Sequence, residues 1–375
     1  MTPAPFIAAA SIPTAIEARM FSEPARRLCA ASLFWIGTML PVDAQSLNDQ
    51  LRTSFAAGEL PGLHGAIIDF RGQRLAEVYF PGEDERWGLP QGLQEHSAGS
   101  LHDLRSVTKS VVGLLYGIAL AEGKVPAPDA PLYAQFPQYP DLMAQPGREL
   151  ILVRHALSMQ MGTEWDEDLP YSDPRNSEIA MENAPDRYRF ILEQPIREAP
   201  GKTWIYSGGA VALLAKLIET GTGLPLDRYA QEKLFAPLRI ETFDWVAGAD
   251  GEPSAASGLR LTLPDLARIG QLVADYGVHD GRQIVPRDWL ELSFEPRAVV
   301  NDGTQYGYLW YLVGAPERTI AVAVGNGGQR LTVQPDPGLV VASFAGRYND
   351  PESWQTSIKV LLDFAVPEAK RLLGK

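Results

Sequence analysis

The pattern of apolar and polar positions first predicts a buried central helix. Residues 107–121, VTKSVVGLLYGIALA, are nearly all apolar and long enough for a helix that ends at Gly123. A helix that is apolar on every side must be covered on every side, so we expect this segment at the centre of the fold. Two more helical patterns cover residues 210–223 and 261–277, the second with Pro264 in its first turn.

Strand patterns lie toward both ends of the chain. Residues 65–80 indicate two strands around the turn Arg71-Gly72-Gln73. After residue 305, strand-like runs follow one another with short turns: 306–313, 318–325, 329–335 and 338–346. We therefore predict an α+β fold in which N- and C-terminal segments form one antiparallel sheet flanked by helices. Residues 45–375 would be this domain, with an inserted, mainly helical lobe at about residues 125–250 and a cleft between the lobes.

The first 44 residues have the order of a secretory leader. Arg26-Arg27 precede an uncharged apolar run, residues 28–41, which is followed by Val42-Asp43-Ala44. This run is too short to span a bilayer comfortably. We expect residues 1–44 to be a signal peptide and the mature chain to be periplasmic or secreted, without stable insertion in a membrane; a terminal helix packed on the domain is the alternative. The only cysteine, Cys29, lies in this leader, so the mature chain would have no disulfide.

Charge and histidine spacing exclude several functional classes. A net charge of −13 argues against nucleic acid as a partner, because phosphate contacts need Lys and Arg patches. The five histidines show no metal-ligand spacing, so we expect no metal and no organic cofactor. The partner would be a small-molecule substrate, and the oligomeric state stays open.

The stretch LRSVTKS places a serine and a lysine three residues apart at the start of the apolar helix. Ser106 and Lys109 share a helix face, so the amine can reach the hydroxyl. An ammonium in apolar surroundings is poorly solvated, which favours its neutral form and lets it accept a proton. The alternative is a capping serine beside a lysine that extends to solvent, and four residues alone do not decide between the two.

Other features test whether a serine nucleophile is plausible. The chain has no Gly-x-Ser-x-Gly motif, which argues against an α/β-hydrolase, and no histidine is an obvious base. Tyr206 stands just before an apolar helix, where it is either a base or a core residue. The segment Gly325–Gln329, GNGGQ, reads as a turn between strands or as a strand end that a ligand approaches closely.

Taken together and in this order, three motifs resemble those of the serine β-lactamase and penicillin-binding-protein-like superfamily. They are Ser106-x-x-Lys109, Tyr206-Ser207-Gly208 and Asn326-Gly327-Gly328. The resemblance covers most of residues 45–350 and is greatest to the branch of class C β-lactamases, DD-peptidases, esterases and 6-aminohexanoate-dimer hydrolases.

The resemblance implies a role for each motif. Ser106 would be the acylated nucleophile and Lys109 its proton acceptor. Tyr206 would be a second base or proton relay whose pKa Lys109 lowers. The segment Asn326, Gly327, Gly328 and Gln329 would be the substrate strand, with the Gln329 N–H joining that of Ser106 in the oxyanion hole.

Two departures from the resemblance concern the substrate. Relatives that bind β-lactams usually carry Asn where this chain has Gly208, and a cation or histidine where it has Asn326. Only Arg330 is nearby as a replacement for that cation. The resemblance therefore implies a serine hydrolase for small esters or amides, including amides of the 6-aminohexanoate-dimer type. The alternatives are a peptidoglycan D-alanyl carboxypeptidase or weak β-lactamase, and a non-catalytic binding or sensor domain.

One acidic segment is a candidate for contact with the substrate. Residues Trp165–Tyr171, which include Asp166, lie between two helical stretches. We expect them to form the lip of the site, where their negative charge would favour an amine-bearing substrate. A plain surface loop is the alternative.

Overall fold

The computed structural model describes residues 46–315 and 318–374. The predicted leader, residues 1–44, therefore lies outside the described residues, as does Cys29. Among the described residues, no helix is both long and apolar enough to cross a membrane.

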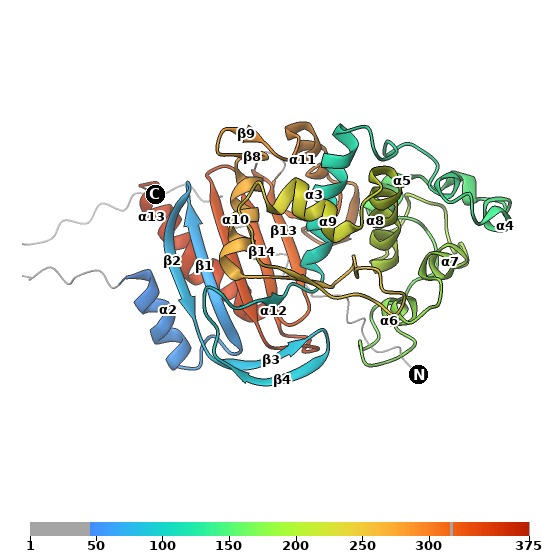
Figure 1. Cartoon of the computed structure of the whole chain (residues 1–375). Helices are drawn as coiled ribbons and strands as arrows, with labels where there is room; N and C mark the ends of the chain where they lie inside the picture. Colours follow the sequence, from blue (N-terminus) through green and yellow to red (C-terminus); the bar gives the residue numbers. More distant parts are fainter. Residues whose placement is uncertain (1–45, 316–317, 375) are drawn as a thin grey trace, which may run out of the picture.

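One antiparallel sheet of eight strands organises the molecule (Figure 1). Its order is β10 (Ala298–Asn301), β11 (Thr304–Tyr306), β12 (Tyr311–Val313), β13 (Ile320–Gly325), β14 (Gln329–Gln334), β15 (Leu339–Ala345), β1 (Leu63–Phe70) and β2 (Gln73–Tyr79). β1 pairs with β15, so the N-terminal hairpin extends a sheet made by the C-terminal third. The predicted α+β fold and the origin of its sheet are confirmed.

The strand prediction was too long at one point. Residues 306–313 do not form one strand, because the chain turns at Leu309, which has a φ of 59°. Tyr306 ends β11, and β12 begins at Tyr311. Both strands contribute to the same sheet, so the prediction was correct in type and wrong in extent.

Three small sheets accompany the large one. They are the hairpin β3 (Gly82–Arg86) and β4 (Leu89–Gln94), the hairpin β8 (Val278–His279) and β9 (Arg282–Gln283), and a three-stranded sheet of β5 (His102–Asp103), β7 (Leu259–Leu261) and β6 (Asp244–Trp245).

Helices cover both faces of the large sheet (Figure 1). They are α2 (Leu47–Ala56), α3 (Val107–Ala121), α4 (Pro140–Met143), α5 (Val153–Leu157), α6 (Ser177–Glu182), α7 (Arg187–Leu192), α8 (Gly208–Thr222), α9 (Leu226–Ala230), α10 (Leu263–Ala274), α11 (Arg287–Ser293), α12 (Trp354–Lys359) and α13 (Val366–Leu372). β1, β13, β14 and β15 are buried along their whole length, as expected for strands covered on both faces.

The central helix α3 has the predicted bounds and lies between the sheet and α8. Its residues from Val107 to Ala119 are all buried. A side chain at Gly117 would meet the Trp289 ring at 2.0 Å, so the glycine lets α11 approach closely. The indole of Trp289 donates a hydrogen bond to the carbonyl of Gly113 at 2.9 Å. These contacts pack α11 against the middle of α3, the helix that begins just after Ser106.

Candidate active site

Ser106 and Lys109 meet at the start of α3, as the sequence predicts. Lys109 Nζ lies 3.1 Å from Ser106 Oγ and 3.0 Å from the carbonyl oxygen of Ala256. The lysine side chain is almost wholly buried, with 1% of its residue surface exposed. A lysine that extends to solvent is therefore excluded. The amine is placed to exchange a proton with the serine hydroxyl.

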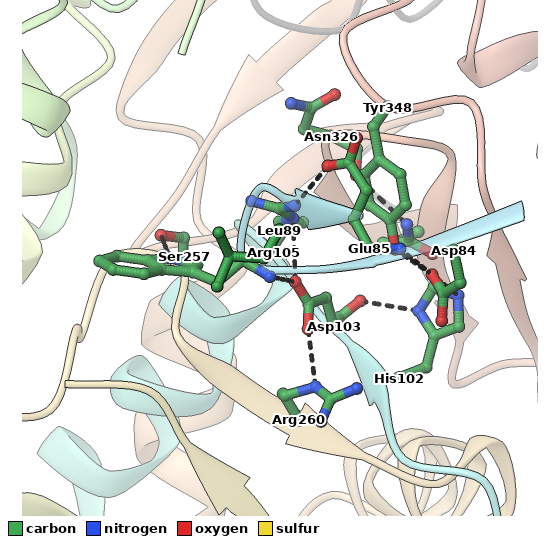
Figure 2. Close-up of polar contacts among 12 residues, drawn as sticks. Asp84, Glu85, Leu89, His102, Asp103, Arg105, Ser257, Arg260, Asn326 and Tyr348 are labelled. Atoms are coloured by element: carbon green, nitrogen blue, oxygen red, sulfur yellow. Dashed lines mark hydrogen bonds and ion pairs between the residues drawn. The ribbon is translucent and has the colours of Figure 1, made fainter. Parts of the chain in front are cut away.

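The residue before Ser106 has an uncommon backbone conformation. Arg105 has a φ of 49°, a region that non-glycine residues seldom occupy. Its guanidinium lies 3.1 Å from Glu85 and 3.3 Å from Asp103, and it stacks over the ring of Tyr348 (Figure 2). These contacts fix the turn that presents Ser106.

Tyr206 completes the constellation from a different element. It stands just before Ser207, which caps α8 by accepting a hydrogen bond from Ala210 N at 3.1 Å. The Tyr206 side chain is hydrogen-bonded to that of Ser106, and Lys109 Nζ lies 4.7 Å from the centre of its ring. Burial raises the pKa of Tyr206 well above its usual value, and the nearby Glu167 adds to the rise. The expected lowering of this pKa was wrong, and Tyr206 is a neutral phenol.

A pair of buried glutamates, which the sequence analysis missed, lies behind the lysine. Glu178 Oε2 is 3.5 Å from Lys109 Nζ, and Ser257 donates a hydrogen bond to Glu178 Oε1 at 2.5 Å. Burial opposes ionisation of Glu178, but the Lys109 charge and the Ser257 hydroxyl hold its pKa below the usual value. Burial and the Glu178 charge raise the pKa of Glu167 to about 8. The pair therefore carries one negative charge at neutral pH, directly beside the lysine.

The glutamate pair explains why position 208 is a glycine. A Cβ at position 208 would lie 2.9 Å from Glu178 Oε2 and 3.2 Å from Glu167 Oε1. The Gly208 N–H donates to Glu167 Oε1. The carboxyl groups thus lie where a side chain at position 208 would begin, and glycine is required for them to approach Lys109.

Two cavities open at Ser106, and both are also lined by Tyr171 and Asn326. The first, of about 330 Å³, is lined by Trp87, Gly88, Arg105, Ser106, Tyr171, Glu178, Ile179, Glu182, Asn183, Ala247, Gly248, Ala249, Ser257 and Asn326. The second, of about 310 Å³, is lined by Ser106, Glu167, Asp168, Leu169, Pro170, Tyr171, Tyr206, Tyr311, Val324, Gly325, Asn326, Asn349, Asp350, Pro351 and Ser353. Cavities of this size hold small ligands. A substrate whose reacting carbonyl lies at Ser106 can place one group in each cavity.

The predicted acidic lip is only partly correct. Tyr171 lines both cavities at Ser106, as expected of a residue that faces the substrate. Trp165 is buried instead, where its indole donates a hydrogen bond to Glu167 at 2.6 Å. Asp166 is exposed and lines neither cavity. The chain alternates between buried and exposed residues here, so Trp165 and Glu167 are buried while Asp166 and Asp168 are exposed. Of the two exposed carboxylates, Asp168 lines the second cavity, as expected of the lip.

The residues of this region that face the cavities begin earlier in the chain than the predicted substrate strand, Asn326 to Gln329. Asn326 lines both cavities, but Gly327, Gly328 and Gln329 line neither. Gly327 and Gly328 have φ of 99° and 100° and form the turn into β14. Gln329 is fully buried, and its side chain bonds to the backbone of Ala345. The prediction that Gln329 N–H faces the substrate was therefore wrong.

The strand that reaches Ser106 is the end of β13. Val324, Gly325 and Asn326 line the second cavity. A Cβ at Gly325 would lie 2.4 Å from the carbonyl oxygen of Leu104, so glycine lets this strand approach the chain that leads into Ser106. The glycine that the motif requires is Gly325 rather than Gly327 or Gly328.

Arg330, the cation that the sequence suggested as a partner for the substrate, also lies away from the two cavities. Arg330 is 2% exposed, lies within β14, and its Nε donates to Thr332 at 3.1 Å. It lines neither cavity. Among the described residues that line the second cavity there is no Lys or Arg.

Replacing Glu167 with glutamine should change the pH dependence of stability. Glu167 keeps its proton up to a pKa of about 8 in the folded chain, against 4.5 for an ordinary glutamate. Between these values the folded state binds the extra proton, so Glu167 lowers the free energy of unfolding as pH rises. We expect wild type to lose about 1.4 kcal/mol per pH unit relative to Glu167→Gln across this interval. Urea unfolding at pH 5 to 9 measures it, and parallel curves for the two proteins would contradict the assignment.

Comparisons with known proteins match most of the chain. A family model described as Beta-lactamase matches residues 56–363. The chain is 25% identical over 345 residues to a 6-aminohexanoate-dimer hydrolase of Paenarthrobacter ureafaciens, with 85% of each chain covered.

Solved structures share the fold. One is EstCE1, a hydrolase with promiscuous acyltransferase activity, at a TM-score of 0.67 and 14% identity over 87% of this chain and 98% of that one. Another is the octameric penicillin-binding protein homologue of Pyrococcus abyssi, at a TM-score of 0.62 and 18% identity over 87% of this chain and 79% of that one.

Proposed function

The chain belongs to the beta-lactamase family and is a serine hydrolase of that fold, and from this premise we propose that it cleaves small esters or amides through an acyl-enzyme on Ser106. One observation carries the proposal. Ser106 Oγ lies 3.1 Å from a buried lysine amine, is hydrogen-bonded to Tyr206, and opens into two cavities. A nucleophile within reach of a base and in the lining of two substrate-sized cavities suits acyl transfer.

Proton movement in the proposed reaction uses the groups behind the serine. As Ser106 Oγ attacks the carbonyl carbon, its proton passes to Lys109, which releases one of its own to Glu178. The neutral Tyr206 gives its phenolic proton to the leaving alcohol or amine. The proton on Glu178 then returns through Lys109 to Tyr206, so the serine proton has in net terms reached the leaving group. Water repeats the sequence in reverse to free the acid.

Backbone N–H groups would stabilise the oxyanion that forms during attack. The start of α3 supplies the N–H of Ser106, and the end of β13 supplies that of Asn326, since Asn326 shares both cavities with Ser106. The Asn326 side chain is held away by Asn349, whose Oδ1 accepts from Asn326 Nδ2 at 2.9 Å. The donor that we propose, the Asn326 N–H, lies three residues before the Gln329 N–H that the sequence resemblance implies.

The charge of the cavities favours neutral or amine-bearing substrates over carboxylates. The second cavity carries Asp168 and Asp350 and, among its described lining, no cation. Arg105 of the first cavity is already paired with Glu85 and Asp103. β-Lactams and D-alanyl peptides bear a carboxylate that needs a cationic partner. A β-lactamase or carboxypeptidase is therefore the less favoured function.

A substrate panel tests the proposal. We expect turnover of p-nitrophenyl acetate and butyrate, with kcat/KM for nitrocefin and benzylpenicillin lower by about 100-fold or more, the discrimination that an unpaired substrate charge imposes. An ω-amino acyl p-nitroanilide should exceed its N-acetyl derivative in kcat/KM. Strong nitrocefin turnover would select the β-lactamase alternative. No turnover of any ester, amide or β-lactam would select the non-catalytic binding domain.

A further inference from the structure

Three histidines and one aspartate form a second cluster of functional side chains, apart from the catalytic groups. It consists of His64 on β1, Asp84 on β3, His96 in the loop after β4, and His102 on β5. We call these four residues the histidine cluster. One nitrogen or carboxylate oxygen from each lies within 4.8 Å of every other. His64, Asp84 and His102 are buried, with 1%, 6% and 1% of their surfaces exposed.

The hydrogen bonds of two rings direct their unprotonated nitrogens toward one another. His102 Nδ1 lies 3.1 Å from the carbonyl oxygen of Asp103, which only an N–H can bond. The His64 ring likewise bonds to the backbone of Glu83. The opposite nitrogens, His64 Nδ1 and His102 Nε2, face each other at 2.9 Å. Two lone pairs therefore point into the same space.

The other two members add electron pairs to this space. Asp84 Oδ1 lies 3.4 Å from His102 Nε2 and accepts a hydrogen bond from Tyr348 at 2.8 Å. His96 stacks on His64 with ring centres 4.1 Å apart, and its buried Nε2 has no hydrogen-bond partner. Imidazole nitrogens and a carboxylate that converge without protons between them repel one another. A cation at their centre removes that repulsion.

We propose that the histidine cluster binds a divalent transition-metal ion, of which Zn²⁺ fits the donors best. Three imidazoles and one carboxylate are a preferred zinc ligand set, and tetrahedral ligands about 2 Å from the ion lie about 3.3 Å apart. The separations of 2.9 and 3.4 Å are close to this value. Two of the ligands also form a further hydrogen bond of the kind that orients metal ligands: His102 to the carbonyl oxygen of Asp103, and Asp84 to the hydroxyl of Tyr348.

The ion would act as a structural clamp beside the active site. Four protein ligands leave no open position for water or substrate, so the site takes no part in the chemistry. Its ligands join β1, the β3–β4 hairpin and β5, and β5 leads directly to Ser106. The tip of the hairpin carries Trp87, whose backbone N–H donates to Asp103 and which lines the first cavity. Figure 2 shows the polar contacts that run from Asp84 and His102 through Asp103 to Arg105.

Metal analysis of the full chain, prepared without a polyhistidine tag, tests the proposal. We expect about one Zn²⁺ per chain by mass spectrometry of the elements, as for a closed four-ligand site. Removal with a chelator should lower the melting temperature, and Zn²⁺ at 100 times its dissociation constant should restore about 5 °C. Exchange for Co²⁺ should give the intense visible absorption of a tetrahedral complex.

Matched variants separate this site from other zinc binding. His96→Gln changes the least buried ligand and should lose the metal while staying folded. His279→Gln, in the β8–β9 hairpin, and Ser106→Ala should both keep it. The proposal is overturned if wild type holds no zinc, shows no tetrahedral Co²⁺ spectrum and does not respond to Zn²⁺, or if His96→Gln retains the metal. Because Ser106→Ala keeps the metal in this scheme, the result is independent of the proposed function.

Discussion

Ser106→Ala is expected to lower kcat/KM for p-nitrophenyl acetate by about 10⁴-fold or more while leaving the fold intact. The substitution removes the only atom that can form the acyl-enzyme, and losing the nucleophile of a serine hydrolase has effects of this size or larger. Steady-state kinetics with active-site titration measures the effect. Among the described residues, the polar partners of the Ser106 side chain are Lys109 and Tyr206, so the melting temperature should change little.

Ser110→Ala is the matched control for this variant. Ser110 lies one turn further along α3, and its hydroxyl donates to the carbonyl of Leu309 at 2.7 Å. Its loss should cost about 1 kcal/mol of stability and leave kcat/KM within a few-fold of wild type. If Ser106→Ala keeps more than a tenth of wild-type activity, Ser106 is not the nucleophile.

Lys109→Ala is expected to have the second largest effect, and it should lower both the activity and the stability of the protein. Loss of the proton acceptor should lower kcat by about 10³-fold, within the range for a positioned general base. The substitution also leaves Glu178 buried without its partner, which should destabilise the fold by about 3 kcal/mol. Single-turnover acylation kinetics and urea unfolding measure the two effects separately.

A double variant distinguishes the chemical role of Lys109 from its structural role. Lys109→Ala with Glu178→Gln removes the unpaired charge, so it should regain most of the lost stability without regaining activity. Lys216→Ala is a control, since Lys216 on α8 pairs with Glu252 at 2.8 Å and lines neither cavity at Ser106. Recovery of activity in the double variant would show that Lys109 serves only to balance Glu178.

The sequence was sufficient where a signal lies within one segment. The apolar run of α3 predicted its bounds, its burial and the meeting of Ser106 with Lys109, because residues three apart share a helix face. The terminal strand patterns predicted the antiparallel sheet. Tyr206 was predicted at the site from its resemblance to known motifs, and the structure brings it to Ser106.

Features that depend on contacts between distant segments were not predictable in this way. Glu167 looked like one more member of an exposed acidic loop, yet it is buried against Glu178 and Gly208. The pKa of Tyr206 depends on how closely the fold excludes water, which no spacing reveals. The histidine cluster takes its ligands from four separate segments, so no local motif could indicate it.

The prediction of the strand that faces the oxyanion was wrong for a different reason. The chain has glycines at 325, 327 and 328, and a motif of the form x-x-Gly fits more than one of them. Only the close approach of Gly325 to Leu104 decides which glycine faces the nucleophile. Register in a turn between two strands depends on the pairing of β13 with β14, which the sequence pattern leaves open.

Covalent labelling tests the central claim most directly. Wild-type protein treated with a fluorophosphonate should gain one phosphonyl group by intact-mass spectrometry, and peptide mapping should place it on Ser106. Ser106→Ala should gain none, while Ser110→Ala should label like wild type. Absence of an adduct on a folded wild-type protein, or an adduct on a different residue, would contradict an acyl-transfer mechanism at Ser106.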